Sequence, residues 1–172
     1  MTAGAPTIGG LKRLSLYLAG QLKSAVDITG GTIAGVSMAG SSVAVTGGIT
    51  SSGPTGTGIG YATGAGGAVT QITSRTTGVT LSKLSGKITT DTTSLASEAA
   101  AEFTVTNTTV ALGDVVVVAI QSGTNGGNTD VFVSTVAAGS FKIKVANNNA
   151  AGGTAETGAI IINFAVIKAV AA

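Results

Sequence analysis

The sequence predicts an all-β protein: an antiparallel β-sandwich of the jelly-roll type, preceded by a short N-terminal arm and a glycine-rich β stalk. Three observations lead to this fold class. Apolar and polar residues alternate in "AEFTVTNTTV", turn signals recur roughly every 8–12 residues, and residues 59–172 contain no sustained helical period. We therefore divide the chain into an arm (1–24), a stalk or linker (25–58) and a β domain (59–172).

The composition indicates that neighbouring chains cover much of the surface. Hydrophobic residues make up 44% of the 172 residues, which is enough for a core, but only 9% are charged. A typical soluble domain has about 25% charged residues, so a monomer of this composition has little charge for its surface. Glycine reaches 27 residues, and small side chains let β backbones from several chains approach closely. We therefore expect the chain to pack against further copies of itself.

The arm contains four leucines on one face of a predicted short helix. Their spacings of three and four residues match the helical period, although a helix this short needs something to dock against. Two interpretations remain open: an anchoring arm that engages a larger particle, or a helix folded back on its own domain. The four leucines are Leu11, Leu14, Leu18 and Leu22.

The stalk is low in complexity and has a repeating pattern. "ITGG" at residues 28–31 returns as "VTGG" at residues 45–48, and single β-forming residues alternate with glycine turns. Wound around a threefold axis, each short strand could place one apolar residue in a shared interior. The alternative is a flexible linker. Ile28, Ile33 and Val45 are the candidate interface residues of the stalk.

The β domain contains seven or eight expected strands. Phe103 and Val105 should point to one side of "AEFTVTNTTV", and "GDVVVVAIQSG" should be a strand that is buried on both faces. Asn125-Gly126 predicts a hairpin turn. A second hairpin should surround "AAGS", with Phe141, Ile143 and Val145 inward and the intervening lysines outward.

The last expected strand, "AIIINFAVIKA", is apolar on both faces. Ile160, Ile162, Phe164 and Val166 would line one face, while Ile161 and Ile167 make the other face apolar as well. A surface strand of a sandwich normally has one polar face. The strand should therefore be either central or covered by a neighbouring subunit, and the scarcity of charge favours the subunit. Ile161 and Ile167 are thus candidate interface residues.

Several partner classes are not expected. Nine basic and seven acidic residues give a net charge of +2, and no basic run exceeds Lys12-Arg13, so a nucleic-acid partner is not predicted. The apolar segment at residues 159–172 is shorter than the roughly 20 residues of a membrane-spanning helix. No signal peptide is evident at the start. We expect a soluble protein with no membrane partner.

The residue types for most catalytic and metal sites are missing. Histidine and cysteine are absent, which excludes nucleophile–His systems and the usual zinc ligands. Glu98 and Glu102 could form a pair of acid/base carboxylates, but "SEAAAE" is more typical of a solvated turn. Asp91 and Asp130 could bind calcium, although ordinary turn formation is favoured. We expect no catalytic residue, cofactor or metal, and the glycine cluster at residues 56–67 fits no nucleotide-binding spacing.

The segment "GIGYATGAGGAVTQITSRTTGVTLSKLSGKIT" resembles a recurrent module of virion proteins of tailed bacteriophages. The similarity continues through "FTVTNTTVALGDVVVVAIQSG" to "INFAVIKAV", and "DITGGTIAGVSMAG" is similar to the glycine-rich repeats of phage fibre shafts. The resemblance implies a trimer without enzyme activity, made in the host cytoplasm and located in the virion, with attachment through its N-terminal part.

The short stalk and the lack of a separate receptor-binding tip favour a capsid decoration (cement) or head-fibre protein. Its partners would be two further copies of itself and the major capsid protein, on the capsid exterior. The alternative is a short tail-fibre or spike component that binds a bacterial surface receptor. A bacterial surface adhesin is a third hypothesis, but it would need an export signal.

Overall fold

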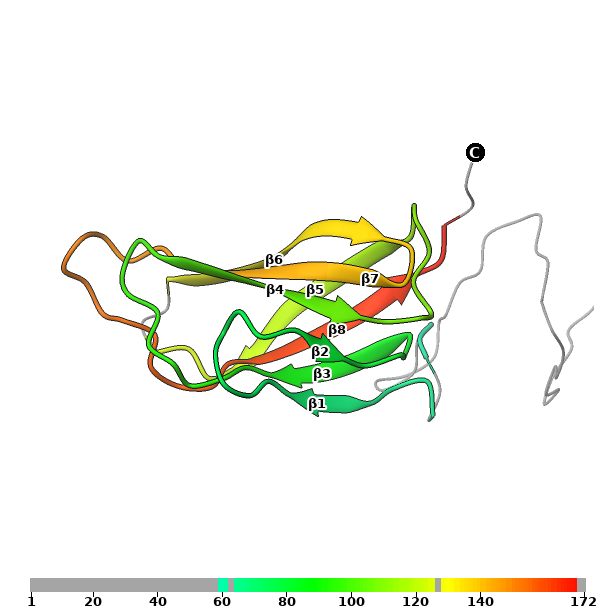
Figure 1. The fold of residues 1–172 in the computed structure, drawn as a ribbon, viewed down its shortest axis with the longest axis horizontal. Coiled ribbons are helices and arrows are strands. Elements are labelled where there is room, and N and C mark those ends of the chain that lie inside the picture. Colours follow the sequence, from blue (N-terminus) through cyan, green and yellow to red (C-terminus); the bar gives the residue numbers. More distant parts are fainter. Residues whose placement is uncertain (1–58, 62–63, 126–127, 170–172) are drawn as a thin grey trace, which may run out of the picture. The chain divides into compact units, whose positions relative to one another are not determined.

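The computed structural model describes residues 59–61, 64–125 and 128–169. This part of the chain is all-β, with eight strands in two four-stranded sheets and no helix (Figure 1). The number of strands and the absence of a helix confirm the coarse fold prediction. The arm and the stalk lie outside the described residues.

Sheet A has the strand order β1-β3-β8-β5. Its strands are β1 (Ala68–Thr70), β3 (Ser85–Thr89), β8 (Ile161–Ile167) and β5 (Val115–Ser122).

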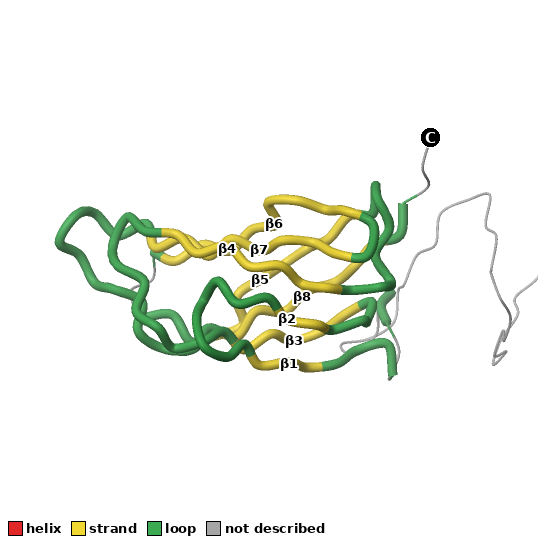
Figure 2. Tube along the Cα trace, in the orientation of Figure 1, coloured by secondary structure: helices red, strands yellow, loops and turns green. Residues whose placement is uncertain are grey.

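Sheet B has the order β2-β4-β7-β6. Its strands are β2 (Val79–Thr80), β4 (Ala100–Thr106), β7 (Ser140–Asn147) and β6 (Thr129–Ala137). The tube in Figure 2 shows the strands of the two sheets as two layers, with long loops gathered at one end.

The chain passes from one sheet to the other at every connection except that between β6 and β7. Two strands that are separated by two such crossings lie in the same sheet and run in the same direction. As a result β1 pairs with β3, and β2 with β4, in parallel, whereas the other pairs are antiparallel. The expectation of purely antiparallel sheets is therefore wrong, and both sheets are mixed.

The inward faces of both sheets contribute to one hydrophobic core. In sheet B, every second residue of β4 and β7 is buried, as the alternation in the sequence predicts. The predicted inward residues Phe103, Val105, Phe141, Ile143 and Val145 are all at most 2% exposed.

Sheet A supplies the opposite half of this core. Ile88 of β3 and Ile162, Phe164 and Val166 of β8 point into it, which confirms the predicted inward face of the last strand. The rings of Phe141 and Phe164 meet across the two sheets, with centroids 5.3 Å apart and an interplanar angle of 56°. Tilted contacts of this kind add about 0.5–1.5 kcal/mol to the burial of the rings.

Two expectations about β5 are wrong. Asn125-Gly126 does not connect a hairpin, because β5 pairs with β8 and β6 belongs to the other sheet. β5 is also not buried on both faces: Val116 is buried, but Val115 and Val117 are exposed. The strand lies at an edge of sheet A, where only its inward face contacts sheet B. The hairpin predicted at "AAGS", between β6 and β7, is confirmed.

Gly123 is the glycine whose replacement should be most damaging. Its φ is +98°, and an added Cβ would stand 2.1 Å from the carbonyl oxygen of Ala159. Gly113 has the same φ with no atom within 4 Å of its Cβ position. We expect Gly113→Ala to cost about 1 kcal/mol, from backbone strain alone, and Gly123→Ala to cost at least about 3 kcal/mol because a backbone clash is added. Urea unfolding of both variants measures the difference, and equal losses would contradict this account of the close approach.

Candidate interaction surface

The outward face of sheet A carries an apolar surface where β5 and β8 lie side by side. Val115 pairs with Ile167, and Val117 with Ala165, so their side chains lie next to each other on this face. Val115, Val117 and Ile167 are 52%, 49% and 54% exposed. Together with Ala165 of β8 and two residues that precede β1, they form what we call the apolar face. Its members are Ile59, Tyr61, Val115, Val117, Ala165 and Ile167.

This face exists because apolar residues occupy positions that are usually polar in a surface strand. An antiparallel sheet with one solvated side normally alternates between apolar and polar residues. In β8 the inward residues are buried, yet Ile161, Ala165 and Ile167 of the outward face are apolar too, with Asn163 between them. Outward β-branched residues still favour a strand, so the fold is kept while apolar surface is left uncovered.

The segment that precedes β1 is fixed beside this face. The hydroxyl group of Tyr61 donates a hydrogen bond to the carbonyl oxygen of Val166, and Lys83 Nζ donates to the Gly64 carbonyl oxygen at 3.1 Å. The backbone N–H of Ser85 donates to the Ala65 carbonyl oxygen at 3.3 Å. These bonds tie the segment to β8 and β3 through both side chain and main chain.

A hollow of about 470 Å³ opens at this place. It is lined by Ile59, Gly60, Tyr61, Ala165 and Ile167. Every side chain in this lining is apolar except for the tyrosine hydroxyl, which is already bonded to β8.

A smaller hollow of about 160 Å³ lies further along β5 and β8. The surface is therefore hollowed along the seam between the two strands. Its lining residues are Val117, Val118, Ala119, Asn163, Phe164 and Ala165.

Asp114 holds the start of β5 to the end of β8. Its carboxylate pairs with the ammonium group of Lys168 and accepts hydrogen bonds from the backbone N–H groups of Ala111 (2.8 Å) and Ala169 (3.2 Å). The hydrogen bond from Lys168, followed by the one from Ala111, lowers the pKa of Asp114. This pairing positions the short loop before β5, in which Leu112 is 72% exposed.

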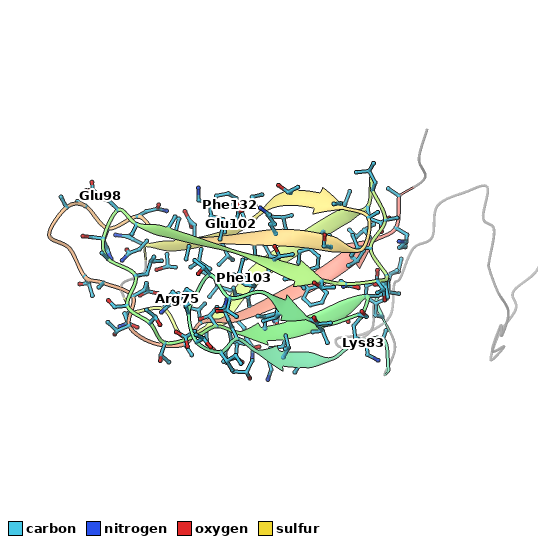
Figure 3. The ribbon with its side chains drawn as sticks, in the orientation of Figure 1. Arg75, Lys83, Glu98, Glu102, Phe103 and Phe132 are labelled. Atoms are coloured by element: carbon cyan, nitrogen blue, oxygen red, sulfur yellow. The ribbon has the colours of Figure 1, made fainter. Side chains whose placement is uncertain are left out.

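The outward face of sheet B has the opposite character. Glu102 of β4 lies between Lys142 Nζ, at 3.0 Å, and Ser134 Oγ, at 2.8 Å. The hydrogen bond from Ser134 and then that from Lys142 lower the pKa of Glu102. Phe132 is 45% exposed among these polar groups (Figure 3). Sheet B thus carries several charged side chains outward, whereas the strands of sheet A carry one, Lys87 of β3, which pairs with Asn163.

Arg75 forms a buried polar centre at the loops between strands. It donates hydrogen bonds to the carbonyl oxygens of Gly158 (2.7 Å), Glu156 (3.2 Å) and Thr93 and to Thr90 Oγ1 (3.2 Å) (Figure 3). Burial lowers the pKa of Arg75, and the charges of Glu156 and Asp91 oppose that shift. The four acceptors are protein atoms in two other loops, the one between β3 and β4 and the one between β7 and β8. Arg75 therefore cross-links these loops, a structural role that the sequence analysis missed.

The carboxylates considered for chemistry are separated. Glu98 lies in the loop before β4 with a φ of 63°, whereas Glu102 is engaged by Lys142. Asp91 closes its own turn, as expected, by accepting the N–H of Thr93 at 2.7 Å, and this turn lowers its pKa. Asp130 lies in β6 rather than in a turn. Within residues 59–61, 64–125 and 128–169, no three His, Cys, Asp or Glu side chains gather as a metal site.

The predicted interface residues fall into two groups. Ile161 and Ile167 both lie on the outward face of β8, where Ile161 is partly buried and Ile167 is exposed. The candidates in the arm and stalk lie outside the described residues: Leu11, Leu14, Leu18, Leu22, Ile28, Ile33 and Val45.

Sequence reasoning missed the partners of Ile167 on this face. Val115 and Val117 were expected to be buried, because four consecutive valines suggested a strand covered on both sides. They are exposed because they lie on the outward face of sheet A, as does Ile167 of the central strand β8, and the sequence pattern does not reveal that this side of the strand faces away from sheet B. The sequence gives no indication that Tyr61 and Leu112 are exposed, beyond showing that they are large apolar residues among weakly polar ones.

Comparisons with protein-family models, with curated proteins and with solved structures found no match to this chain. Among the residues that the structure describes, no helix is long and apolar enough to cross a membrane.

The pairing of Asp114 with Lys168 predicts a pH-dependent contribution to stability. Because the pKa of Asp114 is lower in the folded protein than its unfolded value of about 3.9, the ionised carboxylate stabilises the fold above that pH. The contribution is lost as the pH falls through the lower folded pKa. Asp114→Asn should therefore reduce the free energy of unfolding at neutral pH and make little difference in strong acid.

Urea unfolding from neutral pH to about pH 2 measures this effect. Lys168→Met serves as the matched variant, and the double variant should lose less stability than the sum of the single losses. A difference between wild type and Asp114→Asn that stays constant over the whole pH range would contradict the assignment.

Proposed function

We propose that this chain is a non-enzymatic structural protein of a tailed-phage virion that decorates or cements the capsid surface as a homotrimer. The observation that carries the proposal is the contrast between the two sheets. The apolar face along β5 and β8 has no charged side chain, and the charged residue in the strands of sheet A, Lys87, lies on β3 opposite Asn163. Sheet B carries Glu102, Lys142 and Lys144 outward. A chain with 9% charged residues gains most by hiding its apolar face against copies of itself.

The strand topology supports the finer proposal of a jelly-roll sandwich. Strands β3 to β6 alternate between the sheets, and β7 and β8 then return beside them. As a result β7 lies between β4 and β6, and β8 lies between β3 and β5. An antiparallel pair of long arms wrapped around a core produces this nesting, which is the arrangement of jelly rolls found in viral capsid proteins.

The place where the stalk joins the domain supports the trimer. Residue 58 is bonded to Ile59, which lines the hollow beside Ile167. If the stalks of three copies associate through Ile28, Ile33 and Val45, they hold the three domains at a high local concentration, so that their apolar faces can meet. The apolar face then lies where subunits meet, and sheet B faces outward to solvent.

The arm supplies the attachment to the capsid in this proposal. Leu11, Leu14, Leu18 and Leu22 would dock on the major capsid protein. Three arms held by one trimer bind as a multivalent unit, so that modest contacts for each arm combine into tight attachment. No cofactor, nucleic acid or membrane is required. The resemblance of the sequence to phage virion modules points to the same class of partner.

The trimer proposal predicts different results for two aspartate substitutions on opposite sheets. Ile167→Asp would place unpaired charges in the subunit interface, so the protein should run as a folded monomer. Phe132→Asp is the matched control, because Phe132 is similarly exposed on sheet B, and this variant should remain trimeric. Light scattering measures the masses. A mass of three chains for Ile167→Asp, or a monomeric wild type, would contradict the proposal.

Electron microscopy of virions labelled with an antibody against residues 59–172 tests the proposed location. We expect the antibody to label the whole surface of the head. Pre-immune serum is the control and should give no label. Label confined to the tail would reject capsid decoration and favour the receptor-binding alternative, for which glycan screening would be the next step. Unlabelled virions would reject both virion roles.

A further inference from the structure

We propose that residues 123–125 and 156–158 bind a calcium ion, with the carboxylate of Glu156 as its charged ligand. The two segments belong to the loops between β5 and β6 and between β7 and β8, and the proposal does not depend on the trimer or the capsid. It starts from an unusual side chain: Glu156 is 0% exposed although it lies in a loop. Glutamate is almost never fully buried in a protein unless it has a partner.

Half of this carboxylate lacks a partner within the described residues. Its Oε1 accepts the backbone N–H of Asn125 at 2.6 Å, but its Oε2 has no hydrogen-bond partner. The ion pairs in this part of the chain involve the carboxylates of Glu102 and Asp114 instead. A proton on Oε2 would not satisfy the group, because the O–H would then need an acceptor. Buried charges in proteins are paired or coordinate a metal ion.

The backbone beside Glu156 shows which way its side chain faces. A single nitrogen of Arg75, Nη2, donates to the carbonyl oxygens of both Glu156 (3.2 Å) and Gly158 (2.7 Å). Carbonyl groups two residues apart point to the same side in an extended chain, and the side chains of those residues share a face. Glu156 also forms a β-bridge with Leu95, as expected of an extended segment. The position where Gly158 lacks a side chain is therefore on the same face as the carboxylate.

Two further oxygen atoms face this unfilled position. A Cβ atom at Gly158 would meet Asn125 Oδ1 at 3.3 Å and the Gly123 carbonyl oxygen at 3.5 Å, and apart from its chain neighbours no other described residue would come within 4 Å. The other end of the Asn125 amide, Nδ2, donates to Thr157 Oγ1 at 2.7 Å, which holds Oδ1 in this orientation. A carboxylate, an amide oxygen and a main-chain oxygen thus border one small space.

The chemistry of these three oxygens suits calcium. Calcium takes carboxylate, amide and main-chain carbonyl oxygens at about 2.3–2.6 Å and accepts irregular geometry, whereas magnesium requires a near-ideal octahedron at about 2.0–2.1 Å. Gly123 and Asn125 are exposed, so water can complete the coordination shell on that side. Because the site has one carboxylate, its dissociation constant should be at the weak end of the known range, on the order of 10⁻³ M.

The surrounding charges permit a cation here. Arg75 donates its hydrogen bonds to carbonyl and hydroxyl oxygens rather than to a carboxylate. The charges of both Glu156 and Asp91 act on it and raise its pKa. Two carboxylates therefore face one guanidinium group, and the excess negative charge attracts a cation instead of repelling it.

Urea unfolding of the full-length chain with and without calcium tests the proposal. The protein would first be treated with EDTA and dialysed, and calcium chloride would be compared with magnesium chloride at equal ionic strength. At a dissociation constant of about 1 mM, 10 mM calcium should raise the ratio of folded to unfolded protein about tenfold, and magnesium should have little effect. Amide NMR spectra of the labelled protein should show calcium-dependent shifts at residues 123–125 and 156–158.

Three variants locate the effect. Glu156→Gln removes the charge but keeps an oxygen for the Asn125 N–H, and Gly158→Ala keeps the carboxylate but fills the space beside it. Both should abolish the response to calcium, and Gly158→Ala provides the test if Glu156→Gln does not fold. Glu98→Gln is the matched control, because Glu98 is an exposed loop carboxylate, and it should respond as the wild type does.

Several results would overturn the proposal. If calcium neither stabilises the wild type nor shifts these amides, a water molecule is the partner of Oε2 and there is no metal site. An equal response of wild type and Gly158→Ala would mean that calcium binds elsewhere. Equal stabilisation by magnesium would show a general effect of divalent salt. Loss of the response in Glu98→Gln would place the ion at that residue.

Discussion

The fold depends on one packing constraint: every long strand must turn one of its two faces into the core shared by both sheets. The contact between Phe141 of β7 and Phe164 of β8 joins the two halves of this core. Strict alternation in β4, β7 and β8 meets the constraint, and the outward residues are then free to serve other purposes. On sheet B several of them are charged, and on sheet A those at Val115, Val117, Ala165 and Ile167 are apolar. Core packing therefore does not determine which residues occupy the outward positions, and the two outer faces can differ.

The sequence predicted the features that local periodicity controls. The inward faces of β4, β7 and β8, the β6–β7 hairpin and the all-β class follow from alternation and turn residues, and the structure confirms them. The parallel pairs and the edge position of β5 were not predictable, because they depend on which distant strands meet. Asn125-Gly126 shows the limit well: its local preference for a tight turn does not determine whether the next strand joins the same sheet.

The candidate surface was predicted in part. Ile161 and Ile167 were found because β8 lacks a polar face, which is a signal within one strand. Val115 and Val117 were wrongly predicted to be buried within the domain. An uncharged run has the same sequence pattern whether it is covered by another sheet of the domain or by a second subunit. Tyr61 and the Arg75 centre depend on contacts across 105 and 81–83 residues of sequence. Only the folded arrangement can bring such groups together.

The position of β8 also has a consequence for biosynthesis. It follows the other seven strands in the chain, yet it is a central strand of sheet A, between β3 and β5. During translation these two strands lack their shared neighbour until residue 167 has left the ribosome, so sheet A closes late, through long-range pairing. The surface proposed for assembly includes β8 and becomes complete at the same moment. Chains in which β8 has not yet been made therefore lack this surface and cannot assemble through it.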